Sequence, residues 1–300
     1  NISIARASQN TVKILEDTAN RNHYQLLVKP VEFNITCTYG SKTIEITEFN
    51  GYVERTVAIP DGVDPGRITT GIVLAADGTF SHVPTAIIKV DGRYYARISS
   101  LTNSTYSVIY NPMEFKDMKT HWAREAVGSM GSRLVVSGTG NGQYGLDKDI
   151  TRAEFAAIIV RALGLKEGEG EVKFGDVRNS DWYAGYVDTA VSYGLIMGYS
   201  DSTFGSADKI TREQAMTMIA RAMKLTGLNS PLTEQEIDAQ LSGYADGTSV
   251  SGYAESGIAA CLKTGVAAGR TSSTIVPEGY ISRAETAVML ERLLKKSDLI

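Results

Sequence analysis

The spacing of apolar residues changes near residue 112, and this change divides the chain into two parts. Before it, apolar and polar residues alternate with a period of two, as at 42–47 and 94–98, which predicts half-buried β-strands. After it, apolar residues recur every three to four positions, which predicts amphipathic helices. The boundary is expected at Asn111-Pro112, because proline disfavours continuing a strand or a helix.

Two Asp-Gly pairs, Asp77-Gly78 and Asp91-Gly92, predict tight hairpins in the first part, because this dipeptide supplies the positive φ angles that such turns need. They separate the apolar runs 72–75 and 79–83, and 86–90 and 93–98. Several short strands at this spacing predict an all-β, sandwich-like domain over 1–112. Residues 11–21 are the candidate for a short helix within it.

One motif occurs three times in the second part: Ile, a hydroxyl residue, Arg, any residue, then Glu or Gln. The copies begin at Ile150, Ile210 and Ile281, which are 60 and 71 residues apart. Four landmarks precede each copy in register, namely an aromatic-x-Asp pair, a second aromatic, an aliphatic residue and a glycine. The pairs are Phe115/Asp117, Phe174/Asp176 and Tyr244/Asp246, the second aromatics Trp122, Trp182 and Tyr253, and the glycines Gly138, Gly198 and Gly269.

Each copy predicts two helices joined by a loop of a dozen residues that the glycine opens. The first helices are expected at 122–133, 182–193 and 253–263, and the second begin after the Thr or Ser of the motif. An added short helix is expected at 233–241. One helix pair cannot bury its own apolar face, whereas three pairs closing on each other can, so we predict an all-α unit of three helix–loop–helix modules.

The hydroxyl residue and the Glu or Gln of each motif form a capping-box pattern, which explains both without any ligand. The arginine is not explained in this way, because a cation at the first helical position opposes the helix dipole. Two explanations stay open for Arg152, Arg212 and Arg283. They bind an anion together with free helix N–H groups, or they pair with a neighbouring carboxylate such as Asp117 or Asp176. Likewise the second aromatics are either core residues or exposed platforms for a sugar ring.

The composition of the chain argues against several classes of function. The net charge of −4 does not provide the basic surface of a nucleic-acid binder. No apolar run approaches the roughly 20 residues that span a bilayer. Three scattered histidines and two distant cysteines, Cys37 and Cys261, favour neither a metal site, a catalytic cluster nor a disulfide framework. The abrupt start at Asn1, without a visible signal peptide, suggests a piece of a longer protein.

The repeated landmarks, with His121-Trp122-Ala123 and Ile-Thr-Arg-Ala-Glu, resemble the S-layer homology (SLH) family. The resemblance implies a pseudo-threefold all-α domain with modules at 113–168, 169–228 and 229–300, called modules 1, 2 and 3 below. It also implies an extracellular protein at a bacterial cell wall or S-layer, anchored non-covalently to secondary cell-wall polysaccharide, a peptidoglycan-associated glycan that often carries pyruvate. Binding would occur in grooves between modules.

The resemblance assigns the binding role first to the motif arginines and the second aromatics. The full set of expected carbohydrate-binding residues is Arg152, Arg212, Arg283, Trp122, Trp182, Tyr253, Asp117, Asp176, Asp246, Gly138, Gly198 and Gly269. Copy three departs from the family pattern at Tyr253 and Ser282. We expect each arginine to lie beside the aromatic of the next copy, pairing Arg152 with Trp182, Arg212 with Tyr253 and Arg283 with Trp122. We expect arginine variants to lose little stability.

We expect no enzymatic activity, no cofactor and no membrane insertion. Two alternatives remain. The β-domain belongs to an anchored polysaccharide-acting enzyme, for which Glu45, Glu48 and Glu54 are candidate carboxylates, or the repeats are a purely structural protein–protein array.

Overall fold

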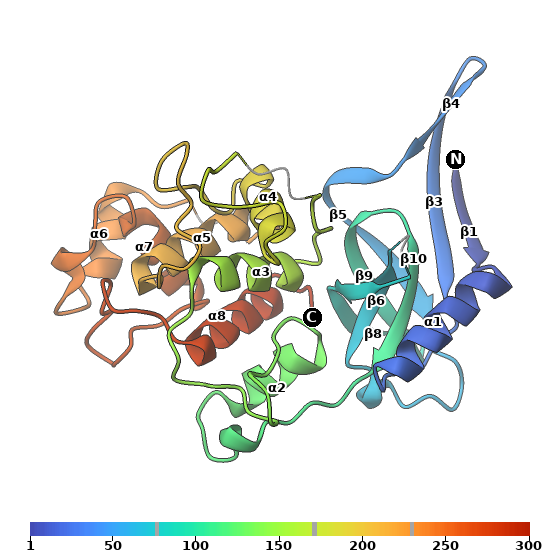
Figure 1. Ribbon diagram of the computed structural model, residues 1–300, viewed down its shortest axis with the longest axis horizontal. Helices are drawn as coiled ribbons and strands as arrows, with labels where there is room; N and C mark the ends of the chain where they lie inside the picture. The colour runs from blue at the N-terminus through green and yellow to red at the C-terminus, as the bar shows by residue number, and fades with distance from the viewer. Residues whose placement is uncertain (76–77, 170–172, 229–230) are drawn as a thin grey trace.

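The computed structural model describes residues 1–75, 78–169, 173–228 and 231–300. A β-rich region is followed by a helical region, and the two lie side by side with the chain passing between them once (Figure 1). The described strands are β1 Ile2–Arg6, β2 Gln25–Leu26, β3 Val31–Tyr39, β4 Lys42–Ile46, β5 Glu48–Ala58, β6 Thr70–Leu74, β7 Phe80–Val83, β8 Thr85–Val90, β9 Arg93–Thr102 and β10 Thr105–Tyr110. The described helices are α1 Gln9–Arg21, α2 Arg124–Ser132, α3 Arg152–Ala162, α4 Ala184–Ser192, α5 Arg212–Leu225, α6 Glu234–Leu241, α7 Glu255–Thr264 and α8 Arg283–Lys296.

The β-region consists of two antiparallel sheets, which confirms the sandwich-like prediction. The larger has the order β1-β3-β10-β6-β7, with β2 added to β10 and β4 to β3, and the smaller has the order β5-β9-β8. Phe33, Tyr106 and Val108 of the larger sheet pack with Val57 and Ile98 of the smaller one. Helix α1, the helix expected at 11–21, buries Leu15 against Ile72 and Ile109.

The predicted hairpins link β6 to β7 and β8 to β9. In the second, Val90 pairs with Arg93 across Asp91 and Gly92, whose φ angles of 48° and 82° fit the expected two-residue turn. In the first, Gly78 has a φ of 84°, while Asp77 lies outside the described residues.

The helical region contains the two helices expected in each module, and the added helix α6 is present as well. The first helices, α2, α4 and α7, begin two residues after the aromatic that was expected to open them. The second helices, α3, α5 and α8, bury the whole predicted apolar stripe, including Phe155, Ile219 and Leu290. These stripes meet in one continuous core shared by all three modules.

The three modules are joined at a central backbone triangle. The N–H of Ile150 donates to Ile281 O at 3.1 Å, that of Ile281 to Ile210 O at 3.1 Å, and that of Ile210 to Ile150 O at 3.2 Å. Each motif isoleucine therefore binds the backbone of both other copies and is fully buried. This cyclic pattern closes the modules into the pseudo-threefold ring that the repeat predicted.

The β-region contacts module 1 and the end of the chain. Tyr52 donates to Leu163 O at 2.7 Å, and Arg97 forms an ion pair with Asp298 at 2.6 Å. The last strand ends at Tyr110, and Phe115 already belongs to the helical core. The ring thus lies on one side of the sandwich, and helices α5, α6 and α7 lie on its far side (Figure 1).

Candidate functional site

Every motif forms the predicted capping box. The side chains of Thr151, Thr211 and Ser282 accept from the third helical N–H, and Glu154, Gln214 and Glu285 accept from the cap N–H. The two preceding N–H groups are occupied as well. In module 1, Arg152 N donates to Asp208 O at 2.9 Å and Ala153 N donates to Ser206 O at 3.1 Å, and the other two modules repeat this arrangement. The expectation of free helix N–H groups is therefore wrong, because the loop of the following module binds them.

The motif arginines, called the ring arginines below, are buried, with exposed fractions of 3%, 2% and 7% for Arg152, Arg212 and Arg283. Each donates from Nε and Nη2 to two backbone carbonyls in the loop of the next module. Arg152 binds Phe204 O at 2.8 Å and Met197 O at 2.7 Å. The equivalent acceptors are Ile275 and Ala268 for Arg212, and Tyr144 and Ser137 for Arg283. The ring arginines thus fasten each module to its neighbour.

The expected ion pairs of these arginines with Asp117 or Asp176 do not occur in the described part of the chain. Arg212 Nη1 pairs instead with Glu285 at 2.8 Å, and Arg283 Nη1 with Glu154 at 3.4 Å. In both cases the partner is the capping carboxylate of the next module. Sequence reasoning assigned these glutamates to capping alone, and they do both.

The aspartates of the aromatic-x-Asp pairs accept hydrogen bonds from backbone N–H groups of the same loops. Asp117 accepts from Tyr144 N and Gly145 N at 2.8–3.1 Å. Asp176 binds the matching N–H groups of Phe204 and Gly205, and Asp246 those of Ile275 and Val276. Burial opposes ionisation of Asp117, but these N–H bonds outweigh it and hold the pKa of the carboxyl below its usual value. In each loop one residue therefore links both groups: its carbonyl accepts from Nε of a ring arginine, and its N–H donates to the aspartate. These residues are Tyr144, Phe204 and Ile275.

The three glycines allow the loop to close over the aromatic of the same pair. A Cβ built on Gly198 would lie 2.4 Å from Phe174 Cε1 and 2.5 Å from Ser200 O. Gly138 and Gly269 are crowded in the same way by Phe115 and Tyr244. These glycines are needed for close packing, since no atom larger than hydrogen fits between ring and loop.

Replacing Gly198 with alanine is therefore expected to destabilise the ring by about 1–3 kcal/mol, the usual penalty for overpacking a filled site. Gly252→Ala is a matched control, because a Cβ there meets nothing within 4 Å. Thermal unfolding of both variants measures the difference, and equal melting temperatures would show that the loop adjusts freely.

The second aromatics behave differently from all other landmarks. Trp122, Trp182 and Tyr253 are 65%, 58% and 57% exposed. They precede their helices instead of lying on the apolar stripe, so the helical period does not bury them. The alternative prediction, that these three aromatics are core residues, is therefore wrong. We call them the platform aromatics below.

The expected pairing of arginines with aromatics is wrong by one module. Trp122 and Arg212 line one hollow of about 350 Å³ together with Arg270, Glu285 and Arg292. We call this hollow the Arg212 groove. It combines a module 1 aromatic, a module 2 arginine and module 3 loop and helix residues, because each arginine already reaches across one module boundary. Arg270 and Arg292 were not predicted from the sequence. Arg292 could have been found from the repeat, because an arginine stands nine residues after the motif arginine in every copy, at Arg161, Arg221 and Arg292.

Arg152 lies near Tyr199 and Tyr253, and the threefold relation makes this position the equivalent of the Arg212 groove, so we call it the Arg152 groove. The ring centroid of Tyr199 lies 4.3 Å from Arg152 Cζ. Tyr253 interacts electrostatically with both groups and donates from its hydroxyl to Glu213 at 2.9 Å. Burial, this hydrogen bond and the charge of Glu213 raise the pKa of Tyr253. From the threefold relation we expect Arg283 and Trp182 to share a third site, which we call the Arg283 groove.

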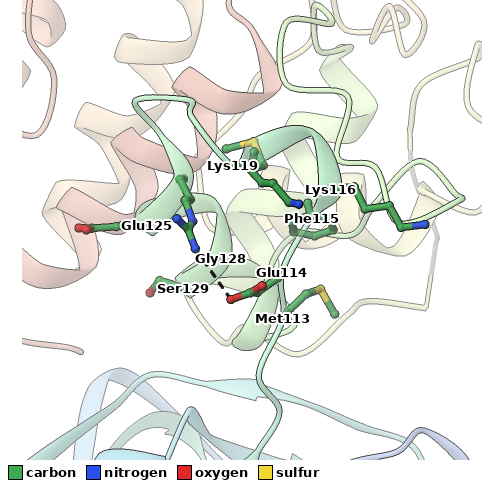
Figure 2. A pocket seen from close by; sticks show the side chains of 10 residues that line it. Met113, Glu114, Phe115, Lys116, Lys119, Glu125, Gly128 and Ser129 are labelled. Carbon is green, nitrogen blue, oxygen red and sulfur yellow. Dashed lines mark ion pairs between the residues drawn. The ribbon is translucent and has the colours of Figure 1, made fainter.

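Another hollow, of about 700 Å³, lies between residues 113–119 and helix α2 and contains none of the predicted ligand contacts. Glu114 lies 4.0 Å from Arg124, an ion pair that a dashed line marks in Figure 2, and Lys116 and Lys119 also line the hollow. Its volume alone does not make it the candidate site.

The geometry defines a class of protein: a closed ring of three helical repeats with exposed aromatics and buried arginines at each module boundary. The family model of the S-layer homology domain matches residues 114–156, 173–216 and 243–287, and the chain belongs to this family, with three tandem SLH domains after a β-region.

Similar proteins are large surface proteins and polysaccharide-acting enzymes. The amylopullulanase of Thermoanaerobacterium thermosulfurigenes is 30% identical over 297 residues, covering 96% of this chain and 15% of that protein. The exoglucanase XynX of Acetivibrio thermocellus is 33% identical over 66% of this chain and 18% of its own length. The surface layer protein of Brevibacillus choshinensis is 36% identical over 42% of this chain and 12% of its own length. The chain thus spans less than one fifth of each of these relatives.

The family and the surface-layer relatives support an extracellular, cell-wall-associated location and a role in attachment to the wall. Within the described ranges, no helix combines the length and hydropathy needed to cross a membrane. The same residues contain no group of three or more His, Cys, Asp or Glu arranged to hold a metal ion.

Proposed function

We propose that this chain anchors a bacterial surface protein non-covalently by binding anionic, pyruvylated secondary cell-wall polysaccharide in the grooves of the SLH ring. The exposure of the three platform aromatics carries the proposal, because large aromatic side chains at equivalent surface positions are not needed for the core. An aromatic face covers the apolar side of a sugar ring. Nearby guanidinium groups attract a carboxylate such as that of a pyruvate ketal.

The lining of the Arg212 groove illustrates the required chemistry. Arg212, Arg270 and Arg292 contribute three positive charges against one carboxylate, from Glu285. Arg270 already donates to both oxygens of Glu285, at 3.1 and 2.9 Å, and to Tyr280 O at 2.6 Å. An anionic sugar would therefore meet a net positive groove bordered by the Trp122 ring.

Substituting the platform aromatic Trp122 is expected to weaken binding without affecting stability. A buried aromatic anchor in an interface typically contributes about 2 kcal/mol, so Trp122→Ala should lower affinity for purified wall polysaccharide about thirtyfold at its groove. Co-sedimentation with the polysaccharide and thermal unfolding provide the two measurements. Tyr39→Ala is the control, because Tyr39 is 91% exposed on β3, outside the ring.

The combined variant Trp122→Ala, Trp182→Ala, Tyr253→Ala tests all grooves together. It should fold and fail to sediment with the polysaccharide. Retained binding by this folded variant would contradict the proposal and favour attachment through another surface.

A second candidate function follows from the amylopullulanase relative, whose similarity extends over the β-region as well as the repeats. In this alternative the β-region belongs to the catalytic or accessory part of an anchored polysaccharide-acting enzyme. Its candidate carboxylates, Glu45 on β4 and Glu48 and Glu54 on β5, are exposed, and Glu54 lies 3.6 Å from Arg97. Release of reducing sugar from wall polysaccharide by the parent chain, abolished in Glu54→Gln, would support this candidate.

A further inference from the structure

The three ring arginines differ in one partner. In Arg212 and Arg283, atom Nη1 donates to a carboxylate at the third position of the next module's second helix, Glu285 or Glu154. The residue at that position in module 2, the module that follows Arg152 in the ring, is Gln214. Among the residues that the structure describes, Arg152 forms no ion pair, whereas both of its equivalents do.

Gln214 still caps its helix, as the glutamates do in the other two modules. Its Oε1 accepts from Thr211 N at 3.2 Å, as Glu154 does from Thr151 N at 2.9 Å. Its own N–H donates to Thr211 Oγ1 at 3.3 Å. The capping box is therefore complete with an amide, and the difference between the modules is one negative charge at a constant position.

Arg152 is consequently a buried cation whose hydrogen-bond acceptors and ring contacts are neutral groups. Two backbone carbonyls accept from it, and the rings of Tyr199 and Phe204 lie 4.3 and 5.0 Å from Cζ. Burial lowers the pKa of Arg152, the direction expected for an incompletely solvated cation. Aromatic faces attract a guanidinium but leave its net charge in place.

Two nearby acidic groups bind other partners. Asp176 binds Phe204 N and Gly205 N with its two oxygens. Glu213 accepts from the hydroxyl of Tyr253 and from Ser251. Asp208 contributes a weaker attraction to Arg152 across the module boundary. None of these carboxylates occupies the place that Glu285 takes beside Arg212.

We propose that Gln214 makes the Arg152 groove the principal acceptor of the anionic group of the glycan, and that Glu154 and Glu285 restrain the other two grooves. The inference rests on the proposed function and deepens it by assigning the charge-selective site. A ligand carboxylate beside Arg152 would supply the negative charge that an internal carboxylate supplies in the other modules. The Arg212 groove ranks second, since Arg270 and Arg292 supply surplus charge, and the Arg283 groove ranks last.

Isosteric Glu/Gln exchange tests this assignment, because either residue completes the capping box. Gln214→Glu should lower affinity for intact wall polysaccharide at least about tenfold, since a charge-assisted pair is lost to an internal competitor. Glu285→Gln and Glu154→Gln should leave affinity unchanged or raise it. Gln235→Glu, on the exposed face of α6, controls for the added negative charge.

Calorimetric titration uses purified secondary cell-wall polysaccharide, either intact or after mild acid has removed its pyruvate, and thermal unfolding checks each variant. Gln214→Glu should bind the depyruvylated polymer as the parent does. If Gln214→Glu binds the intact polymer like the parent, the charge assignment is wrong while anchoring stands. If the parent binds neither polymer, the proposed function itself fails.

Discussion

Contrary to the sequence-based expectation of little loss, replacing Arg212 with alanine is expected to destabilise the SLH ring by about 3–5 kcal/mol, the usual effect of removing one partner of a buried ion pair. The substitution removes the buried partner of Glu285, whose side chain is 13% exposed, and leaves it only the more exposed Arg270. It also removes the donor to the carbonyls of Ile275 and Ala268. An unsatisfied buried carbonyl adds a penalty of about 1–3 kcal/mol, which overlaps the first term.

Denaturant unfolding of the whole chain measures this loss. Arg124→Ala is the matched control, since the Arg124 side chain is 57% exposed and a change there should stay within about 0.5 kcal/mol. If Arg212→Ala unfolds at the same denaturant concentration as the parent, the guanidinium does not fasten the modules. A confirmed loss would mean that weakened glycan binding by an arginine variant cannot by itself be attributed to a ligand contact.

Acidification below pH 6.5 is expected to destabilise the contact between the two regions through His82. This residue is 2% exposed on β7, and Thr70 Oγ1 lies 2.6 Å from its Nδ1. Burial, and then the charge of Arg133, lower the pKa of the imidazole to about 3 from the ordinary 6.5. Arg133 belongs to module 1, so the contact between the two regions contributes to this shift.

The sign follows from proton binding. Below pH 6.5 the unfolded chain takes up a proton on His82 that the folded chain refuses, so stability falls as pH falls, by about 1.4 kcal/mol per pH unit. The contribution is fully present above pH 6.5 and is lost progressively towards pH 3. Between pH 6.5 and 5 the loss should reach about 2 kcal/mol.

His82→Asn keeps a hydrogen-bonding group beside Thr70 and should flatten this pH dependence between pH 6.5 and 5. The exposed His23 provides the control variant His23→Asn, which should retain the slope of the parent. Unfolding curves at three pH values decide the matter. Equal slopes for the parent and His82→Asn would mean that protonation of His82 is tolerated in the folded chain.

Local physics made part of this structure predictable from the sequence. The capping boxes, the apolar stripes of α3, α5 and α8, and the Asp91-Gly92 turn depend on residues within a few positions of each other. The repeat itself predicted three modules. The exposure of Trp122 was not predictable, since its position two residues before a helix is compatible with either burial or exposure.

The roles of the ring arginines required long-range information. Arg152 binds a carbonyl 52 residues away, and Arg283 binds one 139 residues away. Their partners depend on the direction in which the three modules close, and the repeat pattern is the same for either direction. For this reason the sequence predicted groups that recur together but paired them with the wrong neighbours.

The ring closure has a consequence for how such a chain can gain or lose binding capacity. The Arg212 groove draws its aromatic, its arginine and its loop from three different modules, and the central backbone triangle also needs all three copies. Deleting one module would therefore destroy all three grooves, and the two remaining modules would form none. Capacity is not proportional to the number of modules, and gene duplication could extend it only in complete sets of three.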